Sequence, residues 1–135
     1  MKSVIAGGRN VNITKEGEVV LHKIFALYNI TTVANGMCPT GVDKDAYKIC
    51  RSCNLKIIEF PADWDTHGKA AGPIRNSQMI KYIYDGILII FKGGKGTDNI
   101  HQEAIKNHIP VIDLTGDKYG NIKTPLKKQG LFWLR

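Results

Sequence analysis

The sequence lacks any long apolar run. No stretch of its 135 residues approaches the roughly 20 apolar residues of a membrane-spanning helix. A strand-like run begins almost at the first residue, so we expect no signal peptide. The apolar (43%) and charged (23%) fractions are those of an ordinary globular domain. Together these features predict a cytoplasmic protein without a membrane partner.

Cysteines are too few for a disulfide framework or a structural zinc site. Cys38, Cys50 and Cys53 cannot all pair within one chain. The Cys50–Cys53 spacing resembles a redox or metal half-site, but zinc needs two more ligands and no second Cys pair exists. The alternative is one buried helical face, because apolar residues recur at positions 42, 46, 49, 50 and 53. We therefore favour structural thiols in a helix, and expect no metal ion and no cofactor.

Acidic residues are scarce relative to basic ones. The chain has 12 Asp and Glu against 19 Lys and Arg, and its net charge of +7 favours anionic ligands. Residues 116–135 contain Asp117 and five basic residues: Lys118, Lys123, Lys127, Lys128 and Arg135. We interpret them as a solvated basic extension. Nucleic-acid binding through this extension stays open as an alternative, although the chain has no helix-turn-helix signature, aromatic stacking strand or zinc-finger spacing.

Strand-like and helix-like segments alternate along the chain. Strands are predicted at residues 3–6, 31–35, 56–60, 86–91 and 110–114. The unbroken apolar run 86–91 is typical of a parallel strand buried on both faces. The alternation predicts an α/β sandwich of three layers, with a mainly parallel five-stranded sheet between helices.

The composition changes only near the C-terminus. We place one domain at residues 1–115 and a basic extension at residues 116–135. The apolar Leu131–Leu134 is expected to dock on the core or on a partner subunit, so a homo-oligomer is one expectation.

Helix signals lie between the predicted strands. Thr40–Asp43 has the pattern of a capping box that opens the second helix. Pro73 suits the first turn of the third helix, and Thr97 or Asp98 is expected to cap a fourth. The residues expected on buried helix faces are Val20, Ile24, Leu27 and Tyr28 in the first helix, and Ile74, Ile80 and Ile83 in the third.

Four connections are expected to meet at one edge of the sheet. In open α/β sheets, ligands bind beyond the carboxyl ends of the strands, near the point where strand order reverses. The connections that follow strands at this edge contain residues 7–9, 35–36, 63–76 and 93–97. We expect a pocket for an anionic ligand there.

Residues 93–97, Gly-Gly-Lys-Gly-Thr, form a glycine-rich turn between a strand and a helix. Glycines allow close backbone approach, and successive N–H groups at a helix N-terminus can bind phosphate. Lys95 adds a positive charge and Thr97 a hydroxyl, whereas the Asp98 carboxylate would repel phosphate. The pattern matches neither the complete phosphate loop nor Gly-x-Gly-x-x-Gly, and a plain turn is the alternative.

The densest set of functional groups lies at residues 60–76. Arg75 suits bidentate binding of phosphate or carboxylate. Asp63 and Asp65 have the chemistry for acid–base catalysis or for hydrogen bonds to ribose, with a solvated loop as the alternative. Trp64 is expected either to stack on a base or to anchor the loop in the core.

The run from Phe60-Pro-Ala-Asp-Trp-Asp to Gly68-Lys-Ala-Ala-Gly-Pro-Ile-Arg-Asn76 closely resembles the YspA-like, YpsA-related branch of the SLOG superfamily (DUF2493). Three shorter segments are similar to that family's turns in the same order: residues 5–9, in which Gly8 replaces Ser, residues 35–43 and residues 93–97. The resemblance covers about residues 1 to 114, and family members occur in bacteria and their phages.

The resemblance implies a Rossmann-like domain that binds a nucleotide or a nucleotide-derived ligand with a phosphorylated ribose, as a sensor or a sequestering protein. The residues to which it assigns the ligand are Gly7, Gly8, Arg9, Gly36, Lys69, Arg75, Asn76, Gly93, Gly94, Gly96 and Thr97.

Related LOG phosphoribohydrolases, which cleave the N-glycosidic bond of nucleoside monophosphates, imply a second function. Their signature Pro-Gly-Gly-x-Gly-Thr-x-x-Glu ends on a catalytic Glu, where this chain has Ile100. For such a hydrolase we expect Asp43 or Asp63 to supply the carboxylate, because each follows the end of a strand. Glu103 points about 60° away around the fourth helix. We rank ligand binding first, hydrolysis second and nucleic-acid binding third.

Overall fold

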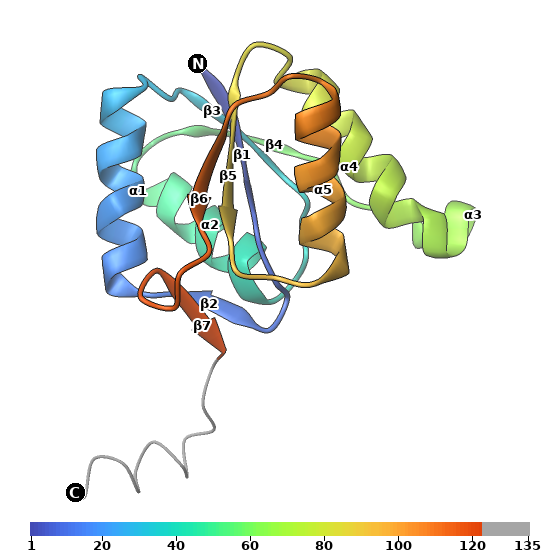
Figure 1. Cartoon of the computed structure of the whole chain (residues 1–135), viewed down its shortest axis with the longest axis horizontal. Helices are drawn as coiled ribbons and strands as arrows, with labels where there is room; N and C mark the ends of the chain where they lie inside the picture. Colours follow the sequence, from blue (N-terminus) through green and yellow to red (C-terminus); the bar gives the residue numbers. More distant parts are fainter. Residues whose placement is uncertain (123–135) are drawn as a thin grey trace, which may run out of the picture.

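The computed structural model describes residues 1–122 and contains a five-stranded, all-parallel sheet (Figure 1). In spatial order the strands are β4 (Lys56–Glu59), β3 (Thr32–Asn35), β1 (Lys2–Ala6), β5 (Ile87–Phe91) and β6 (Val111–Leu114). Each strand end lies within one residue of its predicted position. The predicted Rossmann-like α/β sandwich is therefore confirmed.

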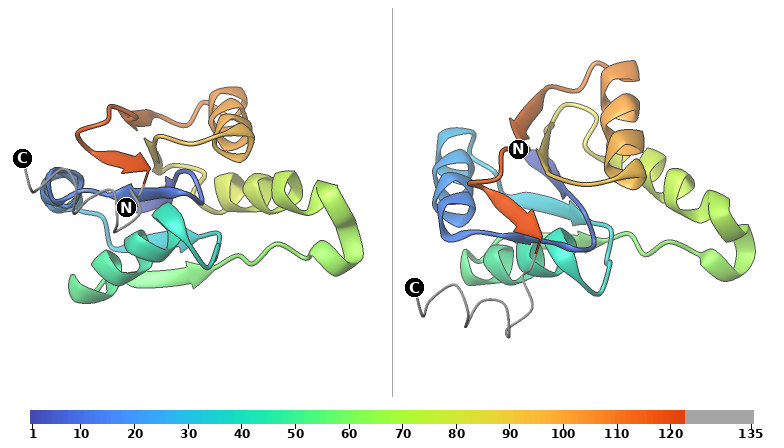
Figure 2. Two further views of the ribbon diagram at one scale, coloured as in Figure 1. Left: turned by 90° about the horizontal axis from the view of Figure 1, so that it is seen from below. Right: turned by 60° about the horizontal axis from the view of Figure 1, so that its bottom comes forward.

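Four long helices cover the two faces of the sheet. One face packs against α1 (Lys15–Leu27) and α2 (Gly41–Ser52), and the other against α4 (Ala71–Tyr82) and α5 (Lys95–Lys106). The short α3 (Trp64–His67) and the 3-10 turn η1 (Gly68–Ala70) precede α4 and project from the body (Figure 2). No helix described within residues 1–122 has both the length and the apolar character needed to cross a membrane.

The core consists of two clusters, one on each face of the sheet. Successive strand residues point to opposite faces, so Ile5 and Ile89 pack with α1 and α2. Val4 and Leu88, one residue earlier on the same strands, pack with α4 and α5. All five residues of β5 are buried, as the apolar run predicts.

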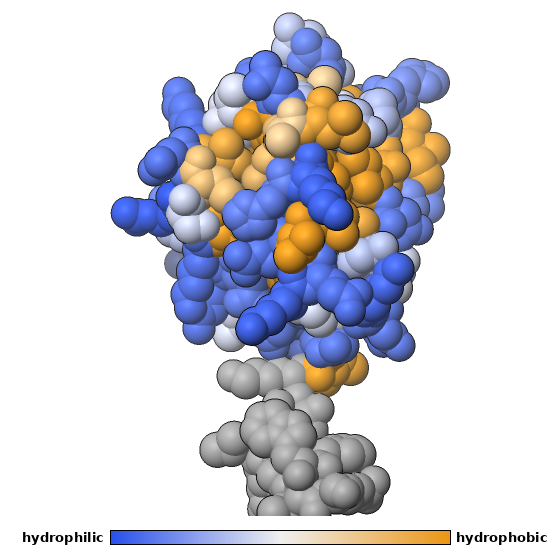
Figure 3. All heavy atoms as spheres, turned by 90° about the vertical axis from the view of Figure 1, so that its left-hand side faces the viewer, coloured by the Kyte–Doolittle hydropathy of each residue, from blue (hydrophilic) through white to orange (hydrophobic). Residues whose placement is uncertain are grey.

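The buried side of α1 differs from the prediction in part. Its buried residues are Gly17, Leu21, Ile24 and Phe25. Leu27 is 77% exposed, and Tyr28 follows the helix as an exposed C-cap. Two apolar stripes lie side by side on this helix, and only contact with the sheet decides which one is covered. Figure 3 faces this side and shows hydrophobic atoms at the surface among hydrophilic ones.

The expected buried side of α4 is also wrong at one position. Ile80 and Ile83 are buried, but Ile74 is 37% exposed. Six residues separate Ile74 from Ile80, which places their side chains about 120° apart around the helix. Met79, which the sequence analysis did not select, is buried.

Thr40 is the N-cap residue of α2 as predicted, but the hydrogen bonds of a capping box do not form, and the predicted cap of α5 is wrong. Thr40 precedes α2, but its hydroxyl donates to the carbonyl oxygen of Arg9 at 2.8 Å instead of accepting from the helix. The Asp43 carboxylate accepts the N–H of Cys38 at 3.1 Å. For α5 the N-cap residue is Gly94, so neither Thr97 nor Asp98 caps it.

A two-stranded antiparallel ribbon, which the sequence did not predict, lies beside the main sheet. It joins β2 (Val11–Ile13) to β7 (Gly120–Ile122). Each strand has only three residues, too few for a clear alternating pattern. Residues 116–122 of the predicted extension therefore belong to the folded body, whereas the predicted docking of Leu131–Leu134 lies outside the described residues.

We predict that Gly17→Ala lowers the free energy of unfolding by about 1–2 kcal/mol. Gly17 packs against the backbone carbonyl of Tyr119, and a Cβ would collide with that oxygen. This collision outweighs the roughly 1 kcal/mol by which a helix favours alanine over glycine. Equilibrium denaturation in urea measures the difference.

Gly96→Ala is the matched control for this substitution. Gly96 also lies in the first turn of a helix, but a Cβ there would meet no atom within 4 Å. The free energy of unfolding of Gly96→Ala is expected to equal or exceed that of the wild type. If both substitutions had the same effect, the contact between α1 and Tyr119 would not matter for stability.

Candidate functional site

A cavity of about 660 Å³ opens at the carboxyl edge of the sheet. It lies beyond β1 and β5, which are neighbours in the sheet although β3 and β4 come between them in sequence. This is where strand order reverses, as predicted for the site. The volume lies within the usual range for pockets that bind small molecules.

Two glycine turns form the floor of the cavity. The N–H of Gly8 donates to the carbonyl oxygen of Lys92 at 2.9 Å. A Cβ on Gly8 would lie 3.2 Å from the Cα of Gly93. The backbones after β1 and β5 therefore approach too closely for larger side chains.

The N-terminus of α5 supplies unpaired backbone donors to this edge. Gly94 is the N-cap residue, and no side chain caps the helix. The first N–H that bonds within the helix is that of Asp98, which donates to the carbonyl oxygen of Gly94 at 3.0 Å. The N–H groups of Lys95, Gly96 and Thr97 come earlier, at the positive end of the helix dipole, where an anion is favoured.

Among the charged side chains of the lining, positive ones outnumber negative ones. Among the described residues, Asp43 is the one carboxylate that lines the cavity, and Asp98 does not. The basic residues in the lining are Arg9, Lys69, Arg75, Lys92 and Lys95. The Lys92 ammonium lies 2.8 Å from the Asp117 carboxylate, so part of its charge is balanced.

Arg75 is held in place by contacts within the protein. Its Nη1 donates to the carbonyl oxygen of Gly36, and its Nε donates to Oδ1 of Asn76 at 3.0 Å. Burial lowers the pKa of the guanidinium, and the charge of Asp43 opposes that effect. No hydrogen bond from Nη2 to another described residue is present, so this nitrogen is available to a ligand.

Asn76 joins α4 to α5. Its Nδ2 donates to the carbonyl oxygen of Gly96 at 3.2 Å and to Oδ1 of Asn99 at 2.9 Å. The side chain is 5% exposed, and its oxygen accepts from Arg75. Asn76 is therefore a positioning residue that fixes the glycine-rich turn relative to Arg75.

Asp43 is the carboxylate with the environment of an acid–base group. Burial raises its pKa above 3.8, while the N–H of Cys38 and the charges of Arg75 and Arg9 act in the opposite direction. A buried carboxyl group with a raised pKa in a cleft is a common feature of catalytic sites.

The other predicted residues fall into two groups. Gly7, Gly8, Arg9, Lys69, Arg75, Asn76, Gly93, Gly94, Gly96 and Thr97 line the cavity. Gly36 and Asp63 do not. The carbonyl of Gly36 binds Arg75, and Asp63 is an exposed N-cap of α3 that accepts the N–H of Thr66 at 3.1 Å. The hydrogen bond from Thr66 lowers the pKa of Asp63, which keeps it ionised.

Trp64 lines the cavity and is 51% exposed, so it does not anchor the loop in the core. Sequence reasoning assigned no role in the site to Asn10, Cys38, Asn99 or Ile122, which also line it. Ile122 comes from the unpredicted strand β7. Cys38 follows the carboxyl end of β3, and this position in the sequence could have identified it as a residue of the site.

Comparison with known protein families finds no match. The gene 61 protein of Mycobacterium phage D29 is 44% identical to this chain over 59 residues, which is 42% of this chain and 46% of the phage protein. The match therefore spans less than half of either protein, and the chain has a partial relative in a phage.

A similarity to a solved structure is weaker. The crystal structure of a predicted subunit of a tRNA methyltransferase from Methanocaldococcus jannaschii aligns with 98% of this chain and 74% of that chain. Its sequence identity is 13% and its TM-score is 0.39. A similarity at this level carries no functional argument.

We predict that Asp43 makes stability fall as the pH rises from acid to neutral. Its raised pKa means that the folded state holds the proton more tightly than the unfolded state. The stabilisation is complete below about pH 3.8 and is lost as the pH rises through the raised pKa. Over this range the free energy of unfolding of the wild type should fall relative to that of Asp43→Asn.

Urea denaturation at several pH values measures this difference. Asp113→Asn is the control with the opposite sign, because a hydrogen bond from Thr115 lowers the pKa of Asp113. Its contribution should be lost as the pH falls. Parallel stability curves for the wild type and Asp43→Asn would contradict the assigned burial of Asp43.

Proposed function

We propose that the protein binds a nucleotide or nucleotide-derived ligand in this cavity, with its phosphate at the N-terminus of α5. The observation that carries the proposal is an uncapped helix N-terminus at a cavity whose lining has five basic side chains and one carboxylate. Backbone N–H groups and positive charge together favour a compact, multiply charged anion such as a phosphate.

The rest of the cavity supports a ligand larger than phosphate alone. Arg75 lies beside the turn, fixed through Asn76, and keeps Nη2 available for a second contact. The half-exposed ring of Trp64 offers an aromatic surface for a base, and Asp43 can accept a hydrogen bond from a ribose hydroxyl. The resemblance of residues 60–76 to the YspA-like family favours the same class of ligand.

The proposal predicts that Lys95→Glu weakens the binding of nucleoside monophosphates by about 10- to 100-fold, since charge-assisted hydrogen bonds contribute about 1.5–3 kcal/mol each. Lys95 lies in the first turn of α5 and lines the cavity. Isothermal titration calorimetry with a panel of nucleoside monophosphates, and with the matching nucleosides, measures the loss. Native mass spectrometry of protein isolated from cells identifies which ligand to include.

Lys106→Glu is the matched control, because Lys106 is exposed in the last turn of the same helix. The affinity of Lys106→Glu for nucleoside monophosphates should equal that of the wild type. Nucleosides, which have no phosphate, should bind equally well to the wild type, Lys95→Glu and Lys106→Glu. Equal phosphate affinity in Lys95→Glu and the wild type would remove the α5 N-terminus from the site.

Hydrolysis of an N-glycosidic bond is the second candidate, and the position of Asp43 favours it. Ile100 is buried and lines the cavity at the position where the phosphoribohydrolases have their catalytic Glu. Asp43 is the lining carboxylate, and its raised pKa suits proton transfer or stabilisation of positive charge on the ribose ring. The nucleic-acid alternative depends mainly on basic residues beyond residue 122, outside the described residues.

If nucleoside monophosphates are cleaved, Asp43→Asn should lower the rate by at least about 100-fold, the usual contribution of general acid–base catalysis. Asp63→Asn should leave the rate unchanged, because Asp63 is exposed and does not line the cavity. Chromatographic detection of released base measures both. Activity that survives in Asp43→Asn would exclude this carboxylate as the catalytic group.

A further inference from the structure

A thiol, an imidazole and a carboxylate form a chain on the surface between α1 and α2. The Sγ of Cys53 lies 3.4 Å from Nδ1 of His22. The other ring nitrogen of His22, Nε2, lies 3.3 Å from Oε2 of Glu18. His22 and Glu18 are one turn apart on α1, whereas Cys53 is the C-cap residue of α2.

This arrangement suits proton transfer and does not suit metal binding. Cys53 and Glu18 contact opposite nitrogens of one ring, so the three groups cannot converge on a single ion. Consistent with this, no metal-binding group of three or more His, Cys, Asp or Glu occurs within residues 1–122. Cysteine nucleophiles are activated by a base beside the thiol, and a third group such as a carboxylate orients that base.

The three free cysteines have different environments. Cys50 is 1% exposed, and burial followed by the nearby Cys53 raises its pKa to about 12, so it is unreactive at neutral pH. Cys38 is partly exposed, contacts no histidine within residues 1–122, and has its Sγ 3.9 Å from the hydroxyl of Thr40. Cys53 is partly exposed and is the cysteine with an imidazole at its sulfur.

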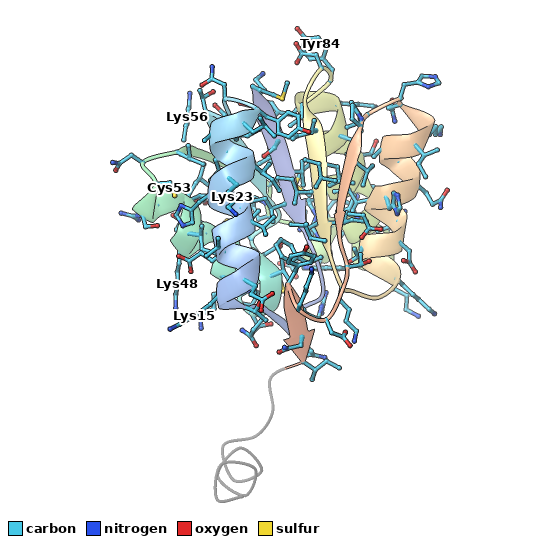
Figure 4. The ribbon with its side chains drawn as sticks, turned by 60° about the vertical axis from the view of Figure 1, so that its left-hand side comes forward. Lys15, Lys23, Lys48, Cys53, Lys56 and Tyr84 are labelled. Atoms are coloured by element: carbon cyan, nitrogen blue, oxygen red, sulfur yellow. The ribbon has the colours of Figure 1, made fainter. Side chains whose placement is uncertain are left out.

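Three lysines lie on the side of the molecule that carries the thiol. Figure 4 shows Lys23 on α1, Lys48 on α2 and Lys56 on β4 on the side that carries Cys53. All three are exposed. Positive charge on this side of the molecule favours the approach of an anionic reagent.

We propose that Cys53 is a site of reversible modification by small anionic disulfides. The thiol gives its proton to Nδ1 of His22, and Glu18 stabilises the resulting imidazolium through Nε2. The Cys53 thiolate attacks one sulfur of the disulfide, whose S–S bond breaks as a bond from Cys53 to that sulfur forms. The other half leaves as a thiolate and takes the proton from His22. Cys53 is oxidised to a mixed disulfide, and the incoming disulfide supplies the oxidising equivalent.

The proposal is tested with the full chain and glutathione disulfide at neutral pH. Mass spectrometry of the intact protein, followed by peptide mapping, gives a rate for each cysteine. We expect Cys53 to be modified at least about tenfold faster than Cys38, and His22→Gln to remove most of that advantage, as pairing with a histidine promotes the reactive thiolate. Cys53→Ser should abolish the fast phase.

Glu18→Gln should slow the reaction less than His22→Gln, because it removes only the partner of the imidazolium. Both side chains are nearly half exposed, so thermal denaturation should confirm an unchanged fold. Equal rates at Cys38 and Cys53, or an unchanged Cys53 rate in His22→Gln, would overturn the proposal.

Cystamine, a cationic disulfide, tests the preference for anions. The rate ratio of glutathione disulfide to cystamine should fall severalfold in the double variant Lys23→Gln, Lys48→Gln, and should stay constant in Lys106→Gln. Added salt should lower the ratio in the wild type, because it screens exposed charges. A ratio that is the same in all variants would overturn the anionic specificity.

Discussion

The close contact between the turns that follow β1 and β5 is the constraint on which the candidate site depends. The Gly8 N–H bonds to the carbonyl oxygen of Lys92, and glycines at positions 8 and 93 let the two backbones meet. The two strands are neighbours in the sheet, yet the chain leaves them toward helices on opposite faces. That divergence opens the cavity and brings the N-terminus of α5 to its floor.

Three partly or fully buried polar side chains fix the wall of this cavity. Asp43, Arg75 and Asn76 come from α2 and α4, and their partners include backbone groups of Gly36, Cys38 and Gly96. Burial shifts the pKa of Asp43 upward and that of Arg75 downward, so each group resists ionisation where it lies. Their mutual attraction limits both shifts. The same contacts that fix the cavity wall therefore surround a carboxyl group whose pKa is raised.

Cys53, the thiol proposed to react, lies at the other end of α2 from the cavity. That helix has Asp43 in its first turn beside the cavity and ends at Cys53, just before β4 starts from the amino edge of the sheet. One helix thus begins at the cavity proposed to bind an anion and ends at the thiol proposed to be modified. The two sites share no described side chain, so modification of Cys53 and ligand binding can be measured separately.

The sequence by itself determined the five strands, their mainly parallel direction in an α/β sandwich and the glycine turns at their carboxyl ends, because periodicity and glycine placement are local properties. Only the tertiary structure decided which apolar stripe of α1 is covered, since Leu21 and Leu27 look alike until the sheet is in place. It also distinguished Asp43 in the cavity from Asp63 on the exposed α3. The β2–β7 ribbon and the contact of His22 with Cys53 join residues far apart in the chain. No local pattern records such contacts, because they arise only when separate elements pack together.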